Sequence, residues 1–327
     1  MKKRKPISGI VHFCVILILV LAILYSGLRI LESTVLHRGQ GSEEDHVSKT
    51  ITRDGIAYFP RQDVTTVLLI GVDAFGPMQS SGFYTNTGAA DVNILLIFDE
   101  TNRVVNVLHL NRDTMVKMPV LGLGGKPAGT YFGQLALSHT YGTGLEDSSE
   151  NTVKTVSDFL YGIEIDYYLT MNMDVIAIMT DAVGGVTVNV RDDFSAIDAT
   201  IPMGEVTLSG AQATHFVRAR NLGDKLNTSR MERHKEYVAG FWEALQARQA
   251  EGADFLLEAY TQADPYIVTD CSANALAGMM ERFSGFALGE MTSPAGENVL
   301  GETYYEFYAD EQALDELILR LLYAPKE

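Results

Sequence analysis

The longest apolar stretch lies near the N-terminus, at residues 9–28 (GIVHFCVILILVLAILYSGL), directly after the cationic segment MKKRKP. About twenty helical residues, each rising 1.5 Å, span a hydrocarbon core of about 30 Å. The cations before the run are expected to stay in the cytoplasm, which places the rest of the chain outside. No small-x-small cleavage site follows, so a retained signal anchor is favoured over a cleaved signal peptide. We predict a cytoplasmic tail at 1–8, a transmembrane signal anchor at 9–28 and a polar juxtamembrane linker at 29–61.

Beyond the linker, shorter apolar runs predict a folded domain. Three of them, at 64–73, 91–100 and 103–113, are rich in β-branched residues and are separated by turn residues, which predicts strands. Their hydrophobicity is nearly continuous rather than alternating. Both faces of these strands are therefore expected to be buried under helices.

Helix-spaced apolar residues follow, interleaved with further strands. The segment SSENTVKTVSDFLYG is expected to begin at a serine cap and end at Gly162, and MDVIAIMTDAVGG to end at Gly184 and Gly185. The segments IDYYLTMN and VTVNV have the composition of strands. The alternation predicts an α/β domain with a mixed β-sheet sandwiched between helices, preceded by the one transmembrane helix.

A helix that begins near Ser229 is expected to end the domain. Its apolar stripe consists of Met231, Val238, Phe241, Trp242 and Leu245. We therefore place the main domain at 62–247. A helix at about 272–283, a strand in TYYEFYA and a last helix from Asp310 predict a C-terminal α/β extension, 248–327, that packs on it.

Charge and cysteine content narrow the function. The 327 residues carry a formal charge of -17, which argues against a general nucleic-acid binder, because such a protein needs a broadly basic surface. The two cysteines, Cys14 and Cys271, leave only one thiol in the exterior part, so neither a disulfide nor a cysteine-rich metal site is expected there. Yet four arginines fall within sixteen residues: Arg218, Arg220, Arg230 and Arg233. A basic cluster inside an acidic protein predicts a pocket for a small anion.

The local sequence around these arginines favours a phosphate. HFVRAR is predicted as a strand, in which Arg218 and Arg220 share a face. Ser229 and Glu232 match a capping box, which makes Arg230 the first helical residue, with Arg233 one turn later. A helix N-terminus already carries positive partial charge, so cations are unfavourable there unless an anion binds. The alternative is a set of solvated surface arginines. In the favoured hypothesis, Arg218 and Arg230 face a solvated pocket.

Acidic residues mark the ends of the predicted strands. Asp73 ends the first, Asp91 opens the second, and Arg112 and Asp113 end the third. If these strands run antiparallel, all four residues meet at one edge of the sheet. Carboxylates beside phosphate-binding arginines suit Mg²⁺, because hard cations prefer oxygen ligands. A turn or capping role remains the alternative for each single aspartate.

These motifs resemble the LytR-CpsA-Psr family of bacterial envelope proteins over roughly 64–245. The resemblance rests on LLIGVD, an aspartate that opens the next strand, NRDTM, VGGVTVNV, and RAR followed by R-x-x-R. It implies a phosphotransferase that moves a glycopolymer from a polyprenyl-pyrophosphate carrier onto peptidoglycan outside the cytoplasmic membrane, with Mg²⁺. It also implies an apolar pocket for the lipid tail.

The resemblance further implies a role for each matching residue. Asp91 and Asp113 would hold the metal, and either could deprotonate the acceptor hydroxyl. The residues expected to bind pyrophosphate are Arg112, Arg218, Arg220, Arg230 and Arg233. We take Asp91, Arg112 and Asp113 as the catalytic set, with Asp73 as a possible addition.

Three positions depart from the family pattern. Ala89 stands where an arginine is common, Asn227 where an acid is usual, and His234 where a glutamine is usual; Asp224 is a candidate to replace the missing acid. These departures leave two alternatives open: a non-catalytic protein that binds prenyl pyrophosphate or polymer, and a hydrolase of the same lipid pyrophosphate. Retention of Asp91 and Asp113 beside Arg112 favours catalysis, since a receptor needs only the arginines.

Overall fold

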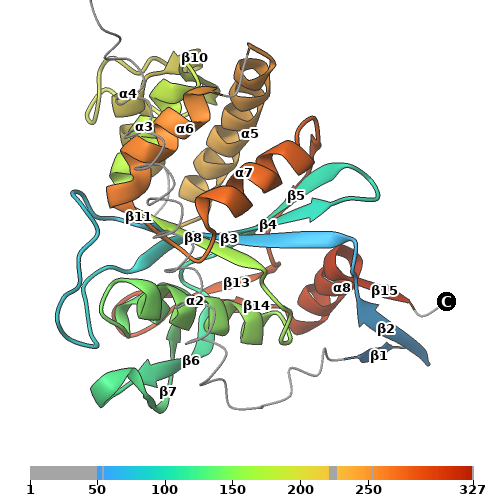
Figure 1. The fold of residues 1–327 in the computed structure, drawn as a ribbon. Coiled ribbons are helices and arrows are strands. Elements are labelled where there is room, and N and C mark those ends of the chain that lie inside the picture. Colours follow the sequence, from blue (N-terminus) through green and yellow to red (C-terminus); the bar gives the residue numbers. More distant parts are fainter. Residues whose placement is uncertain (1–49, 54, 221–226, 252–253, 326–327) are drawn as a thin grey trace, which may run out of the picture. The chain divides into compact units, whose positions relative to one another are not determined.

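The computed structural model describes residues 50–325 except for 54, 221–226 and 252–253 (Figure 1). These residues belong to one compact unit, assigned to Ser48–Glu327. The predicted tail, the anchor at 9–28 and the linker up to residue 49 lie outside the described residues. Within the described residues, no helix has both the length and the apolar character needed to cross a membrane.

A six-stranded mixed sheet forms the centre of this unit. Its order is β11 (Ile267–Thr269), β8 (Tyr167–Met171), β3 (Val64–Val72), β4 (Ala90–Asp99), β5 (Val104–Leu110) and β12 (Ala287–Thr292). The three predicted strands β3, β4 and β5 pair antiparallel. By contrast, β8 runs parallel to β3, and β12 runs parallel to β5. The predicted mixed sheet is confirmed.

One face of the sheet packs against α2 (Glu146–Phe159) and α8 (Glu311–Leu322), which lie below the sheet in Figure 1. Successive side chains of a strand point to opposite faces. The residues on this face are Leu68, Ile70, Leu95, Ile97, Leu108 and Leu110, all buried in a core with Val156, Leu160 and Ile318. The 3₁₀ helix η2 (Leu135–Thr140) also belongs to this side.

Helices α3 (Met173–Ala182), α5 (Thr228–Glu251), α6 (Asp254–Ala263) and α7 (Ala273–Arg282) cover the other face (Figure 1). A second core joins α3 and α5 to α4 (Gly210–Arg218) and the strand pair β9 (Val186–Val190) and β10 (Gly204–Leu208). Its central aromatic rings are Phe194 and Phe216, with centroids 5.6 Å apart. Helices on both faces confirm the predicted sandwich.

Three local predictions were wrong. HFVRAR is not a strand: it continues α4, which ends at Arg218. The helix begins at a capping box in which Ser209 accepts from the Gln212 N–H, and its buried Ala213, Phe216 and Val217 have helical spacing. Helix α5 begins at Thr228, so Ser229 is not its N-cap residue and Arg230 is its third residue.

The third error concerns α2, which begins at Glu146 rather than at a serine cap. Ser148 and Ser149 are buried inside its first turns. Its predicted end is confirmed, because Gly162 adopts a left-handed φ of 79° and donates from its N–H to the Ser157 carbonyl.

The ends of the unit are joined to its centre. β11 and β12 form the two edges of the sheet, although both follow residue 247. Residues from the predicted linker form β1 (Ile51–Arg53) and β2 (Ile56–Pro60), and β2 pairs with β15 (Tyr323–Pro325). The remaining elements are the hairpins β6 (Met115–Leu121) with β7 (Pro127–Gln134) and β13 (Gly296–Leu300) with β14 (Tyr305–Ala309), and the 3₁₀ turns η1 (Leu123–Gly125) and η3 (Asp264–Tyr266).

Candidate functional site

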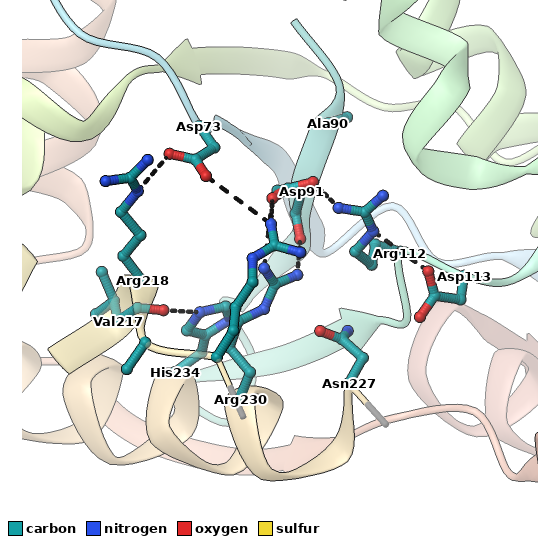
Figure 2. A network of polar contacts seen from close by, with 12 residues as sticks. Asp73, Ala90, Asp91, Arg112, Asp113, Val217, Arg218, Asn227, Arg230 and His234 are labelled. Atoms are coloured by element: carbon teal, nitrogen blue, oxygen red, sulfur yellow. Dashed lines mark hydrogen bonds and ion pairs between the residues drawn. The ribbon is translucent and has the colours of Figure 1, made fainter. Parts of the chain in front are cut away.

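The end of the central sheet gathers the predicted acids. Asp73 follows β3, Asp91 is the second residue of β4, and Arg112 and Asp113 follow β5. Because these strands are antiparallel, all four residues meet at the same end of the three strands, as predicted. The end of α4 and the start of α5 supply the other arginines of this site (Figure 2). We call the seven joined side chains the arginine–aspartate cluster: Asp73, Asp91, Asp113, Arg112, Arg218, Arg220 and Arg230.

Asp91 lies at the centre of the cluster and is 5% exposed. Its Oδ1 pairs with Arg112 Nη1, and its Oδ2 pairs with Arg220 Nη2 and, at 3.3 Å, with Arg230 Nη1. Arg230 Nη2 also donates to the main-chain carbonyl of Asp91 at 3.1 Å. One buried carboxylate thus holds three guanidinium groups close together, which keeps cationic donors concentrated at one point.

Arg218 and Arg220 form the accessible side of the cluster, with about half of each side chain exposed. Arg218 Nε pairs with Asp73 Oδ1 at 2.7 Å, and Arg220 Nη2 lies 3.8 Å from Asp73 Oδ2. The guanidinium of Arg218 also lies over the ring of Phe75, 5.3 Å from its centroid. Their exposed N–H groups can bind an incoming anion.

Arg230 is buried, not solvated as expected: its side chain is 7% exposed. Burial lowers the pKa of Arg230 to about 10, although Asp91 opposes this effect. Arg230 therefore remains charged at neutral pH. Its Nε is also buried without a hydrogen-bond partner, a condition that costs free energy and that a bound acceptor would relieve.

Asp113 lies on the opposite side of Arg112 from Asp91. Arg112 Nε is 3.3 Å from Asp113 Oδ1, and Gln134 Nε2 donates to the same oxygen at 3.0 Å. Burial raises the pKa of Asp113, against the opposing effects of Arg112 and Arg230. An acid with a raised pKa beside a cationic cluster is a candidate for proton transfer.

Arg233 makes different contacts from those assigned to it. It is buried, its Nε and Nη2 donate to the carbonyls of Phe216 and Ala219, and its Nη1 pairs with Asp192 at 2.6 Å. Arg233 therefore holds the main chain on both sides of Arg218. These contacts fit a positioning role, because each of its three nitrogens donates to a group outside the cluster.

An apolar cavity of about 390 Å³ opens beside the cluster, between the sheet and the helices α3, α5, α6 and α7. Its walls include the strand residues that face away from the α2 side, namely Val67, Leu69, Ile94, Leu96 and Val107. Gly71 also lines it, and a Cβ there would meet the Val92 side chain at 2.9 Å. The polar end of the cavity is formed by Asp73, Asp91, Arg218, Arg230 and His234.

Comparison with known proteins identifies the family. A model of the LytR_cpsA_psr family matches residues 28–321. The chain belongs to the LytR_cpsA_psr family.

Relatives within this family have names that refer to cell-wall polymers. The chain is 27% identical over 268 residues to the polyisoprenyl-teichoic acid–peptidoglycan teichoic acid transferase TagU of Oceanobacillus iheyensis, covering 78% of this chain and 74% of that protein. It is 27% identical over 199 residues to TagU of Bacillus subtilis, covering 61% of this chain and 58% of that protein. The match to the second relative thus spans less than two thirds of its length.

Solved structures of the family share the fold. B. subtilis TagV superimposes with a TM-score of 0.61 at 24% identity, over 80% of this chain and 96% of TagV. TagT bound to LI-WTA has a TM-score of 0.61 at 21% identity, over 84% of this chain and 94% of TagT. The predicted α/β class of the folded domain is therefore confirmed.

Two of the three residues that depart from the family pattern, Asn227 and His234, form side-chain hydrogen bonds in the structure. Asn227 Nδ2 donates to Asn111 Oδ1 at 3.2 Å, and Asn111 Oδ1 also accepts from the Asp113 N–H. His234 Nε2 donates to the Val217 carbonyl at 2.9 Å, and burial lowers the pKa of His234 to about 3, so its ring is neutral. Ala89 accepts a main-chain bond from Asp91, and Asp224 lies outside the described residues.

A metal would have to share the cluster with Arg112. Among the residues that the structure describes, no group of three or more His, Cys, Asp or Glu side chains is placed to hold an ion. Asp91 and Asp113 lie on opposite sides of the Arg112 guanidinium, and each turns its Oδ1 toward a different nitrogen of that group. Two carboxylate oxygens fit Mg²⁺ when substrate phosphates supply further ligands, as is common for this ion.

Proposed function

We propose that this chain is a membrane-anchored phosphotransferase facing the cell wall, which moves an anionic glycopolymer from a polyprenyl-pyrophosphate carrier to peptidoglycan. One observation carries the proposal: the arginine–aspartate cluster caps the polar end of an otherwise apolar cavity. A lipid-linked pyrophosphate has the same division between a charged head and an apolar tail. The predicted anchor at 9–28 and the names of the relatives support the location and the acceptor.

The carrier would bind with its pyrophosphate among the guanidinium groups and its first prenyl units in the cavity. Arg218 and Arg220 are exposed enough to receive the head group, and Arg230 connects the cluster to the cavity wall. Charge-assisted bonds between guanidinium and phosphate are among the stronger hydrogen bonds in proteins. The lipid tail gains from leaving water, at about 25 cal/mol per Å² of apolar surface.

Transfer would replace the phosphoanhydride bond of the carrier with a phosphoester bond to the acceptor. A peptidoglycan hydroxyl oxygen attacks the phosphorus that carries the glycan, and the bond from that phosphorus to the bridging oxygen breaks. The electron pair leaves with polyprenyl phosphate, and the hydroxyl proton passes to the Asp113 carboxylate. Arg112, Arg220 and Arg230 stabilise the negative charge that grows on the leaving phosphate.

We propose Mg²⁺ as the cofactor, held by Asp91 and Asp113 together with phosphate oxygens. When bound, the ion would neutralise phosphate charge as a Lewis acid. The Arg112 guanidinium already lies between these two carboxylates, which supports this point as one that accommodates a cation.

Asp113 distinguishes the transferase from a receptor. A binding protein needs the arginines but gains nothing from a buried acid whose ionised form is disfavoured by burial. The acid has a use if it accepts a proton during the reaction. This observation also fits a hydrolase, so the experiment must identify the acceptor.

The test uses the full chain in detergent with Mg²⁺, a prenyl-pyrophosphate-linked saccharide and a soluble peptidoglycan oligomer. Mass spectrometry is expected to find saccharide joined to the oligomer through a phosphate. Arg220→Gln should lower the rate by about 100-fold, as expected for removal of a donor to transition-state charge. The matched control is Arg191→Gln, an exposed arginine that pairs with Glu236. Bound but unreacted lipid would indicate a receptor, and free saccharide phosphate without joined product would indicate a hydrolase.

A further inference from the structure

The two sides of the cluster differ in their surroundings. Asp73, Asp91, Arg218 and Arg230 line the apolar cavity, whereas Arg112 and Asp113 do not. In a phosphoryl transfer, the attacking and leaving oxygens lie roughly in line on opposite sides of phosphorus. If the lipid phosphate leaves toward the cavity, the acceptor hydroxyl must approach from the side of Asp113.

Two hairpins meet on that side. Phe307 of β14 donates from its N–H to the Asp113 carbonyl at 2.9 Å, and Thr114 and Phe307 form a parallel bridge. Gln134 of β7 donates both to Asp113 Oδ1 and, at 2.8 Å, to the Tyr305 carbonyl. Asp113 is thus joined to both β6–β7 and β13–β14. Both hairpins lie on the side of the sheet opposite α3, α5 and α6 (Figure 1).

The alternation of side chains defines which residues share the outer surface with Asp113. Thr114 and Phe307 are buried, as are Val116 and Met118 on β6. Their neighbours along each strand must point the other way. These neighbours, together with the cross-strand partner of Lys117, form what we call the acceptor face: Met115, Lys117, Phe132, Glu306 and Tyr308.

The acceptor face combines aromatic rings with hydrogen-bonding groups. Phe132 is 56% exposed and Tyr308 is 38% exposed, although such rings usually lie inside. Tyr308 donates its hydroxyl to Glu306 Oε2 at 2.7 Å, which holds the ring and the carboxylate side by side. Lys117 lies across the strands from Phe132. A sugar ring has an apolar C–H surface and a rim of hydroxyl groups, so it matches this combination.

We propose that the acceptor face binds a sugar ring of the peptidoglycan glycan strand and presents its hydroxyl to Asp113. This inference rests on the proposed transferase function, because the acceptor is defined by that reaction. Continuity with Asp113 through Gln134 and Phe307 favours this ligand over a membrane surface. The two carboxylates Glu297 and Glu306 on this hairpin also oppose binding to anionic lipid.

The experiment compares Tyr308→Ala and Phe132→Ala with the wild-type full chain, and with Met203→Ala as a control for an exposed apolar side chain next to β10. We expect the KM for the peptidoglycan oligomer to rise about three- to tenfold for each aromatic variant. The kcat and the affinity for the prenyl-pyrophosphate saccharide should stay unchanged. Tyr308→Phe should keep most of the acceptor affinity if the ring provides the contact.

A separate binding measurement keeps this inference distinguishable from the proposed function. The oligomer is titrated into each protein without lipid substrate and followed by calorimetry. Oligomer binding that depends on Tyr308, in a protein that transfers nothing, would support the acceptor face and refute the transferase. Transfer by the wild type with unchanged acceptor KM in both aromatic variants would refute the acceptor face alone. A loss confined to membrane-embedded substrate would assign this surface to the bilayer and also refute the inference.

Discussion

Arg230→Met provides a sharp test, because the structure predicts opposite effects on stability and on activity. A pKa lowered from 12.5 to about 10 means that keeping this guanidinium charged in the folded protein costs about 3 kcal/mol at neutral pH, since each pH unit is worth about 1.4 kcal/mol. The cost is present in full below pH 10 and disappears between pH 10 and 12.5. Asp91 would keep its pairs with Arg112 and Arg220 in the variant.

Methionine fills a similar volume without the buried charge. The value of about 3 kcal/mol already includes the attraction of the Asp91 carboxylate, and loss of the bond to the Asp91 main-chain carbonyl offsets part of the gain. We therefore expect the free energy of unfolding to rise by about 1–2 kcal/mol, which corresponds to a Tm increase of about 2–6 °C. Loss of a preorganised cationic donor should lower the transfer rate by about 100-fold or more. Calorimetry or thermal scanning measures the first effect, and the mass-spectrometric transfer assay measures the second.

A fall in Tm of several degrees would refute this reasoning, because it would show that Arg230 stabilises the fold on balance. Unchanged transfer would refute its role at the site. Arg230→Lys serves as the comparison, since lysine keeps the charge but not the planar, multiply donating group. It should recover little activity.

Three further predictions follow from other parts of the site. Asp113→Asn should remove the acidic limb of the pH–rate profile, because only the ionised acid accepts a proton and burial raises its pKa. A limb that persists in the variant would exclude Asp113 as the base. Arg233→Met should weaken binding of the pyrophosphate head by about tenfold, because the Phe216 and Ala219 carbonyls lose their donors and the arginines beside them shift; unchanged affinity in calorimetry would contradict the positioning role. Leu96→Trp should fill part of the cavity and lower the affinity for the prenyl-linked substrate by more than tenfold, whereas inorganic pyrophosphate should bind as before; an equal loss for both ligands would separate the cavity from lipid binding.

The sheet end could be predicted from sequence because it depends on local chemistry. Runs of β-branched residues bounded by turns define β3, β4 and β5, and the short DETNR turn requires β4 and β5 to be antiparallel. Asp73, Asp91 and Asp113 then fall at one edge by strand direction alone. The mixed nature of the sheet beyond these three strands depends on pairings between distant segments, such as β12 with β5. No local pattern specifies such pairings.

The wrong predictions arose where the segment considered was too short to show the helical spacing of its apolar residues. HFVRAR is too short to reveal helical spacing, but the capping box at Ser209 and Gln212 and the spacing of Ala213, Phe216 and Val217 were visible upstream. The different contacts of Arg230 and Arg233 could not be predicted from the sequence. The two residues are one helical turn apart, and their spacing does not show that Arg233 would bind the main-chain carbonyls of Phe216 and Ala219. The hydrophobic pattern of the strands could not predict the cavity either, because a strand residue that lines a cavity is as apolar as one that packs against other side chains.

The cluster is best understood as a set of exchangeable ion pairs. Without ligand, the carboxylates of Asp73 and Asp91 partner the arginines that a phosphate would need, and the Arg112 guanidinium partners the two carboxylates that a cation would need. An arriving pyrophosphate competes with the carboxylates for the guanidinium groups and so frees carboxylate oxygens for the proposed Mg²⁺. Each ligand should therefore tighten the binding of the other by the same factor, because coupling between two binding sites is reciprocal. Titrations of Mg²⁺ with and without pyrophosphate measure this factor directly. A value of one would show that the two ligands bind independently, and no Mg²⁺ binding in either titration would show that the carboxylates serve only to hold the arginines in place.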